Sequence, residues 1–487
     1  MIEKIKELTK DTIIYGISTI VGRFLGFLLT PFYTNVFPPY ENGVFSNIFA
    51  YIAFINIIFI YGMDAAFMKY YSLADEHDKK KIFSTPFLFV GLTSIFFSLC
   101  LFIFSGTFIS LMEIPGKYSH LYYYIIPILL FDAVALVPFA NLRMKRKAFK
   151  FTTIKIVNIL INITLNFVLV LKFNYGIEAI FIANLIASVF SFAALLPDII
   201  QSLELKVYKD ILVKMIKFGI PYLPASLAAM IVQVVDRPIV LSLTDYDTVG
   251  IYQANHKLGV FMMLFVSMFQ YAWQPFFLTN AREEKAKEIF SKILTLFLLA
   301  ASFIWILLTL FVEDFARIEI FNKFHIIGSE FWGGLYIVPV ILLAYLFNGL
   351  YVNFTAGIYI EEKTKYIPLV TGAGAAVNIL LNFLLIPIIG IFGAAFAALT
   401  SYITMASGLF YFSQKFYMIK YEYKKIVKII ALIFCTGTVY YILLFNYGLE
   451  LLSKMILLIS FVTALIALRI VSKDELIKVS KILLRIK

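Results

Sequence analysis

The sequence predicts an all-α membrane protein that crosses the bilayer many times, and three observations lead to this fold class. Hydrophobic residues make up 61% of the 487-residue chain, and the mean hydropathy is +0.90. Charged residues make up only 15%, whereas soluble domains carry about 25%. Apolar runs of about 20 residues recur along the chain, the length of a helix that spans the hydrocarbon core. We therefore expect a bundle of transmembrane helices.

Fourteen apolar runs between charged loops are the predicted transmembrane helices. They cover residues 12–36, 43–68, 84–111, 121–141, 153–172, 176–197, 213–243, 250–278, 289–312, 331–360, 366–387, 391–412, 426–446 and 450–470. The first run is too long for the apolar part of a signal peptide, and it lacks a small-residue cleavage site. We therefore expect it to be retained as the first span.

Lysine and arginine are distributed unevenly between the two sides of this topology. With the N-terminus in the cytoplasm, the outer side holds only Lys117, Lys172, Arg317, Lys323 and Lys454. The other loop cations fall on the inner side, which is the positive-inside pattern. Both termini are therefore predicted to be cytoplasmic. The formal net charge of +12 belongs to the inner loops and does not indicate nucleic-acid binding.

Two short motifs occur twice in the chain. Asn162-Ile-Thr-Leu-Asn166-Phe in the fifth predicted helix returns as Asn378-Ile-Leu-Leu-Asn382-Phe in the eleventh. Tyr40-Glu-Asn-Gly43-Val-Phe, which opens the second helix, resembles Asp247-Thr-Val-Gly250-Ile-Tyr at the start of the eighth. The copies lie six helices apart. An even offset preserves orientation, so the repeats are predicted to be parallel.

The repeat predicts two six-helix lobes, residues 1–211 and 212–415, followed by two appended helices and a cytoplasmic tail, 416–487. Two such lobes that face each other enclose a central cavity, which can open to either side of the membrane. This is the architecture of a secondary transporter.

Several other classes of function find no support in the sequence. The phosphate-binding motif Gly-x-x-x-x-Gly-Lys-Ser/Thr does not occur, so no nucleotide site of that kind is expected. The four histidines are scattered without the spacing of metal ligands, so no metal is expected. The loops are short and carry no recognisable catalytic arrangement. We therefore expect a protein that is not an enzyme and has no cofactor.

Three cations lie inside apolar runs: Arg23, Arg237 and Lys257. A charge at bilayer depth costs roughly 2.5–3.5 kcal/mol on insertion scales, so such residues usually face a cavity or a partner. We predict that all three bind an anionic cargo, with Asp236 orienting Arg237 and Pro238 opening that helix. The alternatives are a structural ion pair at Arg23 and a Lys257 side chain that snorkels outward.

Other polar residues in the predicted helices have weaker assignments. Asp64 either couples an ion or pairs with Lys69, and Asp132 either counters Arg23 or carries a coupling proton. Secondary cavity contacts are assigned to Lys69, Asn162, Asn166, Asn378, Asn382, Gln270 and Gln274. The asparagines have a structural alternative, because amide side chains bond neighbouring helices in membranes. The glutamines flank Trp273, whose alternative role is that of an interfacial anchor.

An ordered set of motifs resembles a known family. The set comprises Gly22-Arg23, Glu41-Asn-Gly43-Val-Phe, Tyr61-Gly-Met-Asp64-Ala-Ala-Phe-Met-Lys69-Tyr70-Tyr71, Asp236-Arg237, Val249-Gly250-Ile251-Tyr252, Asn378-Ile-Leu-Leu-Asn382-Phe and Gly390-Ile-Phe-Gly393-Ala-Ala. With these motifs the chain resembles the Wzx-type oligosaccharide flippases, polysaccharide transporters of the multidrug/oligosaccharidyl-lipid/polysaccharide (MOP) exporter superfamily. Lys69 stands where the family often has arginine, which keeps the charge but loses the planar fork.

The resemblance implies a secondary-active flippase in the cytoplasmic membrane. Such a protein translocates undecaprenyl-pyrophosphate-linked oligosaccharide repeat units for O-antigen, capsule or exopolysaccharide synthesis. It would work by alternating access, with its cavity cations on the pyrophosphate. Coupling to an H⁺ or Na⁺ gradient or to the membrane potential is implied, as are membrane lipid and the polymerase and chain-length components of the pathway as partners.

Three alternatives stay open at this point. They are a flippase for the peptidoglycan precursor lipid II, a cation-coupled multidrug exporter, and a non-transporting scaffold subunit of a polysaccharide assembly complex. Cavity carboxylates would suit a drug exporter better than cavity arginines. A scaffold would not depend on its buried cations.

Overall fold

The computed structural model describes residue 22, residues 24–320 and residues 323–470. Its helices are α2 (Pro39–Ile60), α3 (Met63–Ser72), α4 (Lys79–Ile103), α5 (Ser105–Leu111), α6 (Tyr122–Met144), α7 (Ala148–Leu171), α8 (Glu178–Ser202), α9 (Lys209–Gly219), α10 (Tyr222–Val234), α11 (Asp236–Leu243), α12 (Tyr246–His256), α13 (Val260–Asn280), α14 (Ala286–Ala316), α15 (Val338–Ile360), α16 (Tyr366–Ile389), α17 (Ile391–Phe416), α18 (Tyr423–Asn446) and α19 (Leu451–Ala467).

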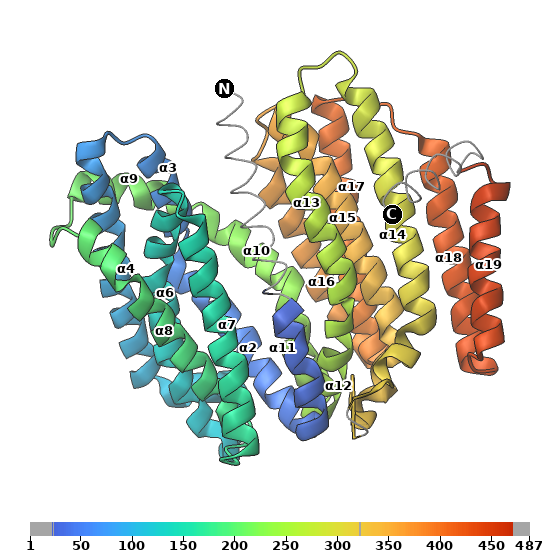
Figure 1. Cartoon of the computed structure of the whole chain (residues 1–487), viewed down its shortest axis with the longest axis horizontal. Coiled ribbons are helices and arrows are strands. Elements are labelled where there is room, and N and C mark those ends of the chain that lie inside the picture. Colours follow the sequence, from blue (N-terminus) through green and yellow to red (C-terminus); the bar gives the residue numbers. More distant parts are fainter. Residues whose placement is uncertain (1–21, 23, 321–322, 471–487) are drawn as a thin grey trace.

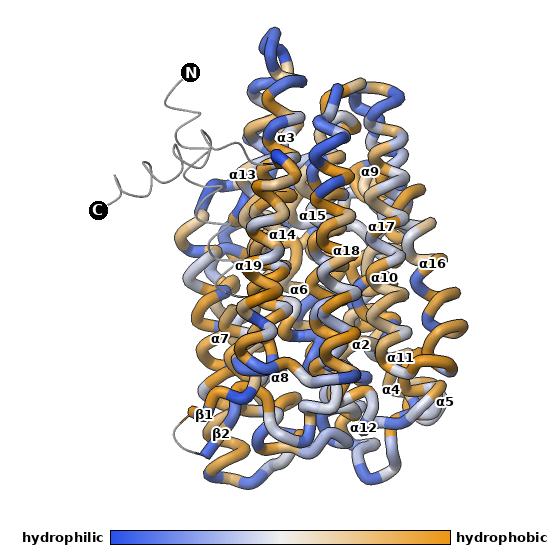
Figure 2. The backbone as a smooth tube through the Cα atoms, turned by 90° about the vertical axis from the view of Figure 1, so that its right-hand side faces the viewer, coloured by the Kyte–Doolittle hydropathy of each residue, from blue (hydrophilic) through white to orange (hydrophobic). Residues whose placement is uncertain are grey.

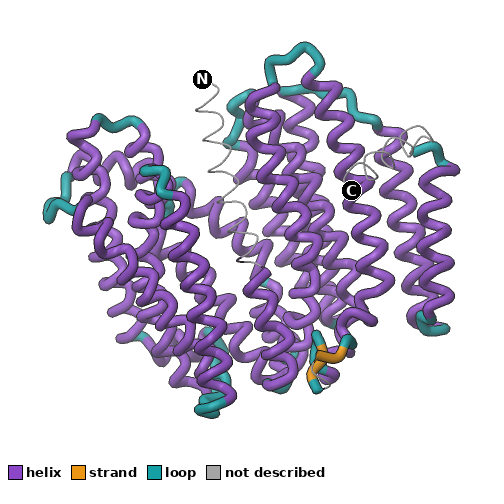
Figure 3. Tube along the Cα trace, in the orientation of Figure 1, coloured by secondary structure: helices purple, strands orange, loops and turns teal. Residues whose placement is uncertain are grey.

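Short 3-10 segments and one small hairpin complete the described chain. The 3-10 segments are η1 (Glu76–Asp78), η2 (Gly116–Leu121), η3 (Lys257–Gly259) and η4 (Ser329–Ile337). Strands β1 (Glu319–Ile320) and β2 (Phe324–His325) pair antiparallel at one end of the molecule, called here the hairpin end (Figure 3). The sequence topology predicts that this end faces outward and that the opposite, loop end faces the cytoplasm. The predicted all-α fold class is confirmed.

The helices have the length and composition of membrane spans. Within the described ranges, eleven are long and apolar enough to cross a bilayer, and α9 with α10 makes a twelfth if this bent pair is one span. Two shorter apolar helices, Phe24–Val36 and Leu451–Ala467, accompany them. Hydrophobic residues predominate along the helices and hydrophilic ones gather in the end loops (Figure 2). The chain is a polytopic membrane protein, and the count of fourteen spans stays a prediction.

The helices form two bundles that approach each other at the hairpin end and stand apart at the loop end (Figure 1). One buried core runs from Leu29 to Met215 and holds α2 to α9 together. The other runs from Ala228 to Ile470 and also takes in Phe27 of the first helix. We call them the first and second bundles. The division at 1–211, 212–415 and 416–487 stays a prediction.

The predicted span 213–243 is not one continuous helix. It is divided into α9, α10 and α11, and α9 and α10 are bent by 41° at Ile220–Pro221. Pro221 has no backbone N–H to continue the helical ladder, which accounts for the break. The interruption expected near Pro238 lies at Val235, so Pro238 falls in the first turn of α11, where no N–H is needed. The span therefore changes direction at Ile220–Pro221.

One further span expected to be continuous is broken, whereas the eighth is not. The second ends α2 at Tyr61 and restarts as α3 after Gly62, and both residues have left-handed backbone, with φ of 35° and 74°. The eighth passes from α12 through the 3-10 turn η3 into α13 as one span of 35 residues, Tyr246–Asn280. Discontinuous helices in transporters commonly line the substrate site, because their free ends can contact a ligand. The break at Tyr61–Gly62 adjoins Ile60 and Asp64, which line one of the cavities described below.

At the hairpin end the bundles are in direct contact. The Asn35 amide donates to the carbonyl of His325 (2.6 Å) and accepts from its backbone N–H (3.0 Å). The N-terminal parts of α2 and α12 also meet, with the rings of Tyr40 and Tyr246 at 5.4 Å. The structure is therefore closed between the bundles on the side predicted to face outward.

Candidate functional site: two polar cavities

A cavity of about 560 Å³ lies in the second bundle where it faces the first helix. We call it the first cavity. Its polar lining consists of Gln233, Arg237, Gln253, His256, Lys257, Ser267, Gln270, Tyr345, Asn348, Tyr351, Thr371 and Tyr402. Gly26 and Phe27 line it from the first helix. No carboxylate is found among the described residues that line it, so its fixed charge is positive.

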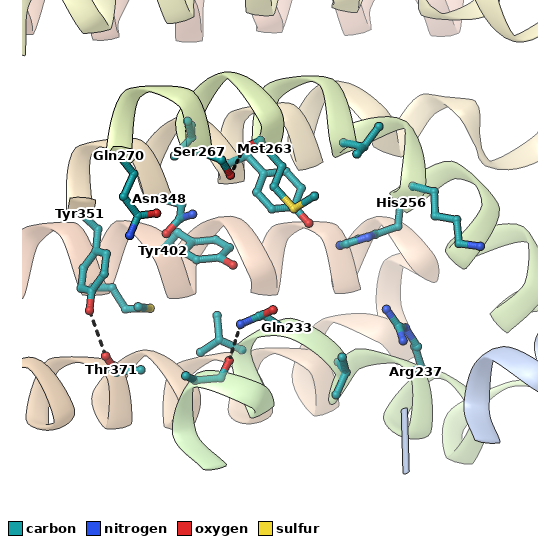
Figure 4. Close-up of a pocket in the computed structure, with 18 of the residues that line it drawn as sticks. Gln233, Arg237, His256, Met263, Ser267, Gln270, Asn348, Tyr351, Thr371 and Tyr402 are labelled. Atoms are coloured by element: carbon teal, nitrogen blue, oxygen red, sulfur yellow. Dashed lines mark hydrogen bonds between the residues drawn. The ribbon is translucent and has the colours of Figure 1, made fainter. Parts of the chain in front are cut away.

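The cations gather at one end of the first cavity. Arg237 lies in the first turn of α11, and Lys257 begins the 3-10 turn η3, so both stand where the α-helical hydrogen-bond pattern changes. Arg237 and His256 face this end of the cavity from opposite sides, on facing elements (Figure 4). The Lys257 ammonium lies 5.7 Å from the centre of the Tyr33 ring. Both predicted second-bundle cations therefore line one cavity.

The Asp236 carboxylate forms no ion pair with the Arg237 guanidinium among the described residues. Its buried carboxylate accepts a hydrogen bond from the Tyr252 hydroxyl and another from the Arg237 backbone N–H (3.0 Å). The Nε of Arg237 is itself buried without a hydrogen-bond partner among the described residues. A buried unpaired donor on a cation is costly unless a ligand pairs with it. This end of the cavity is therefore suited to an anion, and the planar guanidinium suits phosphate oxygens.

The other end of the first cavity is uncharged. Gln270, Asn348 and Tyr351 come together there, and the Tyr351 hydroxyl is 3.3 Å from that of Thr371 (Figure 4). The sequence assigned only Gln270 to this lining. The tyrosines and Asn348 were missed because such residues in an apolar helix look like packing residues. Gln274 lies one turn further along α13 and is exposed outside this lining.

A second cavity of about 450 Å³ lies inside the first bundle, and we call it the second cavity. Its polar lining consists of Asn56, Asp64, Asp132, Arg143, Lys155, Asn158, Asn162, Asn184, Ser188 and Ser191. Three of the predicted residues, Asp64, Asp132 and Asn162, are thus brought together. Asp132 shares this lining with Ser188 and lies within electrostatic reach of Lys155.

Lys155 and Arg143 were not predicted as cavity residues. Both were counted among the cytoplasmic loop cations. The structure begins α7 at Ala148 rather than at 153, so Lys155 lies about two turns inside the helix. Its ammonium lies 4.2 Å from the Phe139 ring. In the sequence, a charge within two turns of a helix end looks the same whether it lies in a loop or lines a cavity.

The repeated asparagines form the same contact in both bundles. Asn166 donates to the backbone carbonyl and the side-chain Oδ1 of Asn162, and Asn382 does the same to Asn378. Asn166, Asn378 and Asn382 are buried between helices and line neither cavity, whereas Asn162 also faces the second one. The geometry fits the structural alternative for three of the four.

The remaining predicted residues lie elsewhere. The Lys69 ammonium lies over the Phe218 ring at 3.9 Å and forms no ion pair with Asp64 in the described structure. Arg23 lies outside the described residues, although Gly26 and Phe27 from the next turn line the first cavity. The part of the chain that the structure describes holds no cluster of His, Cys, Asp or Glu suited to a metal ion.

Two helical bundles with polar cavities and broken helices define a multi-span membrane protein with sites for a polar ligand between its helices. Residues 8–281 match the family described as "Polysaccharide biosynthesis protein", and the chain belongs to this family. The resemblance seen in the motifs is confirmed. No curated protein matches the chain.

Solved structures share the fold at low sequence identity. The lipid II flippase MurJ in an inward closed conformation has a TM-score of 0.73 at 19% identity, covering 94% of this chain and 98% of its own. An inward-facing MATE multidrug resistance transporter of the MOP superfamily has a TM-score of 0.64 at 13% identity, with coverage of 81% and 94%. An outward-facing MATE transporter has a TM-score of 0.61 at 12% identity, with coverage of 84% and 95%. The proteins named are a flippase and transporters rather than enzymes.

Proposed function

We propose that this protein is a secondary-active flippase for a lipid-linked saccharide, carried on undecaprenyl pyrophosphate, in the synthesis of a surface polysaccharide. Membership of the polysaccharide biosynthesis family supports the pathway. The fold shared with a lipid II flippase supports a lipid-linked cargo. The protein would lie in the cytoplasmic membrane with both termini in the cytoplasm.

One observation carries the proposal: the Arg237 Nε is buried and unpaired while the adjacent carboxylate is held by Tyr252. Lys257 lines the same end of the cavity. Two positive groups in a lining that contains no carboxylate complement a diphosphate, which has several acceptor oxygens. Gln270, Asn348 and Tyr351 at the other end complement the hydroxyl groups of a sugar.

The cycle would be alternating access between the two bundles. The contact at the hairpin end closes one side, and the cargo would enter from the loop end. Asp64 and Asp132 are proposed as counter-charges or as sites of ion coupling, with H⁺, Na⁺ or the membrane potential as the driving force. Polymerase and chain-length proteins of the pathway are the proposed partners.

A second candidate is a flippase for lipid II. The match to MurJ, which spans nearly all of both chains, favours it. A multidrug exporter for cationic drugs fits less well, because the described lining of the first cavity carries cations and no carboxylate. A scaffold subunit gives no reason for an unpaired buried arginine.

Reconstituted transport tests the proposal. The purified full chain is placed in liposomes with a fluorescent polyprenyl diphosphate saccharide, and translocation is followed by quenching from outside. Arg237→Ala should lower the rate about 10- to 100-fold, because a hydrogen bond to a charged group contributes about 1.5–3 kcal/mol. Arg237→Lys keeps the charge and should lose less. Arg282→Ala, in the exposed loop before α14, is the matched control.

Wild-type rates on a lipid II probe and on an oligosaccharide probe separate the first two candidates. The flippase proposal is contradicted if the folded wild-type protein transports neither probe. It is also contradicted if Arg237→Ala transports both probes at the wild-type rate. Transport of a cationic dye instead would favour the exporter.

A further inference from the structure

The second cavity is polar although it lies within a membrane bundle. Helices α2, α3, α6, α7 and α8 all contribute to its lining, and four asparagines and two serines face it. The Oδ1 of Asn56 is buried there without a hydrogen-bond partner among the described residues. Buried amide groups without partners are unfavourable. The cavity therefore has free hydrogen-bonding capacity for a polar ligand, and its volume lies within the usual range of small-molecule sites, about 300–1,000 Å³.

The charges of the second cavity balance, unlike those of the first. Asp64 and Asp132 are matched by Arg143 and Lys155, all four in the lining. A metal cation would have to enter beside two fixed cations, and an anion beside two carboxylates, so neither is favoured. A ligand with many hydroxyl or amide groups can use donors and acceptors together.

A chain of contacts joins the two cavities. The Lys257 ammonium of the first cavity lies over the Tyr33 ring, and the Tyr33 hydroxyl donates to Asn166 Oδ1 (2.9 Å). The Asn166 amide donates in turn to Oδ1 of Asn162, which lines the second cavity (3.1 Å). The cation end and the second cavity therefore flank the same part of the first helix, from opposite bundles.

We propose that the second cavity binds sugar residues of the lipid-linked saccharide, while the diphosphate is bound by Arg237 and Lys257. This inference rests on the proposed function and adds to it a saccharide site in the first bundle. Asn56 and Asn184 are the residues that give it specificity. The occupant is uncharged or zwitterionic, because the lining has no net charge.

Direct binding to the purified full chain tests this division. Three probes are used: farnesyl diphosphate, the intact lipid-linked saccharide from cells that make the protein, and the saccharide released from it by mild acid. The double variant Asn56→Ala with Asn184→Ala should weaken binding of both saccharide probes about tenfold, and leave farnesyl diphosphate unchanged. Arg237→Ala should weaken binding of the two probes that carry a diphosphate, farnesyl diphosphate and the intact lipid-linked saccharide. It should leave binding of the released saccharide unchanged.

Controls keep the result interpretable. Asn446→Ala, at the exposed end of α18, removes an amide far from both cavities and should change no affinity. If the double variant does not fold, the single variants and Ala187→Val, which adds bulk to the same lining, replace it. Thermal unfolding in detergent checks that each variant is folded.

The outcomes separate the two proposals. Unchanged saccharide affinity in folded cavity variants overturns the saccharide site, as does binding of Na⁺ that Asp132→Asn abolishes. If farnesyl diphosphate binds but the saccharide adds no affinity, the site fails while the flippase proposal stands. If the released saccharide binds through Asn56 and Asn184 but no diphosphate binds, the flippase proposal fails and the site stands.

Discussion

Gly43 on α2 and Gly250 on α12 lie where each helix meets the backbone of the other. A Cβ atom on Gly43 would lie 1.9 Å from the carbonyl oxygen of Tyr246, and one on Gly250 would lie 2.0 Å from that of Pro39. The two glycines are the equivalent positions of a motif that occurs twice in the sequence. The bundles are therefore closed at the hairpin end by a reciprocal contact that needs glycine on both sides.

Gly43→Ala and Gly250→Ala should each disfavour this closed state. Backbone atoms cannot rotate away as a side chain can, so the helices must separate, and overpacking costs about 1–3 kcal/mol. The population should shift toward a hairpin-open state about 5- to 100-fold. Spin labels at Lys117→Cys and Glu330→Cys, with Cys100 and Cys435 replaced by serine, report the distance between the bundles.

Gly91→Ala is the matched control for this experiment. A Cβ at Gly91, in the middle of α4, has nothing within 4 Å. The distribution of distances between the two spin labels in Gly91→Ala should equal that of the labelled protein with Gly91 intact. An unchanged distribution in both Gly43→Ala and Gly250→Ala would show that the contact does not control opening.

Tyr252→Phe should weaken both stability and anion binding. The variant leaves the buried Asp236 carboxylate without its hydroxyl donor, which costs about 1–3 kcal/mol. The freed carboxylate can then attract the Arg237 guanidinium. We expect a lower Tm in detergent and weaker binding of farnesyl diphosphate.

Adding Asp236→Asn to Tyr252→Phe removes the unpaired negative charge. The double variant should recover part of the affinity for farnesyl diphosphate. A double variant that binds as weakly as Tyr252→Phe alone would show that Asp236 does not compete for Arg237.

Asn166→Ala and Asn382→Ala should lower thermal stability by similar amounts, because each amide makes the same two bonds to the asparagine four residues earlier. Loss of a buried amide costs about 1–3 kcal/mol. Asn166→Ala should lose slightly more, since it also releases the Tyr33 hydroxyl. Thermal unfolding of the purified variants measures both, with Asn446→Ala as the exposed control. If the Tm is unchanged in both variants, Asn166 and Asn382 do not have the structural role assigned to them.

The predicted orientation can be tested with single cysteines introduced into a protein whose Cys100 and Cys435 are replaced by serine. Glu283→Cys lies in the loop between α13 and α14, and Lys117→Cys lies in η2 at the other end of the molecule. The positive-inside rule predicts that a membrane-impermeant maleimide labels Lys117→Cys in intact cells and Glu283→Cys only after the cells are opened. The reverse pattern would place the hairpin end in the cytoplasm.

The sequence predicts those site residues whose charge contrasts with the apolar helix around them. Arg237 and Lys257 stand out because an apolar helix has little use for a charge. Tyr345 and Tyr351 do not stand out, since tyrosine is common in packed helices, and only the three-dimensional arrangement places them in the first cavity.

The helix breaks show a second limit. The apolar pattern runs through Tyr61–Gly62 without interruption, so this span was predicted as continuous. Pro221 is the ninth residue of its predicted span, beyond the first turn where proline is tolerated, but the apolar pattern continues on both sides of it. Hydropathy records which residues face lipid or core, but it does not record the direction of the backbone.

The break at Ile220–Pro221 also affects how the two halves of the chain are joined. Met215 of α9 is buried in the first bundle, and Val232 of α10 is buried in the second. The connection is therefore a bent helix anchored at both ends, as Figure 1 shows, and not a slack tether. A helical link of this kind restricts the directions in which one bundle can rotate against the other. Two fragments expressed separately would keep their anchors only if the cut fell between α9 and α10.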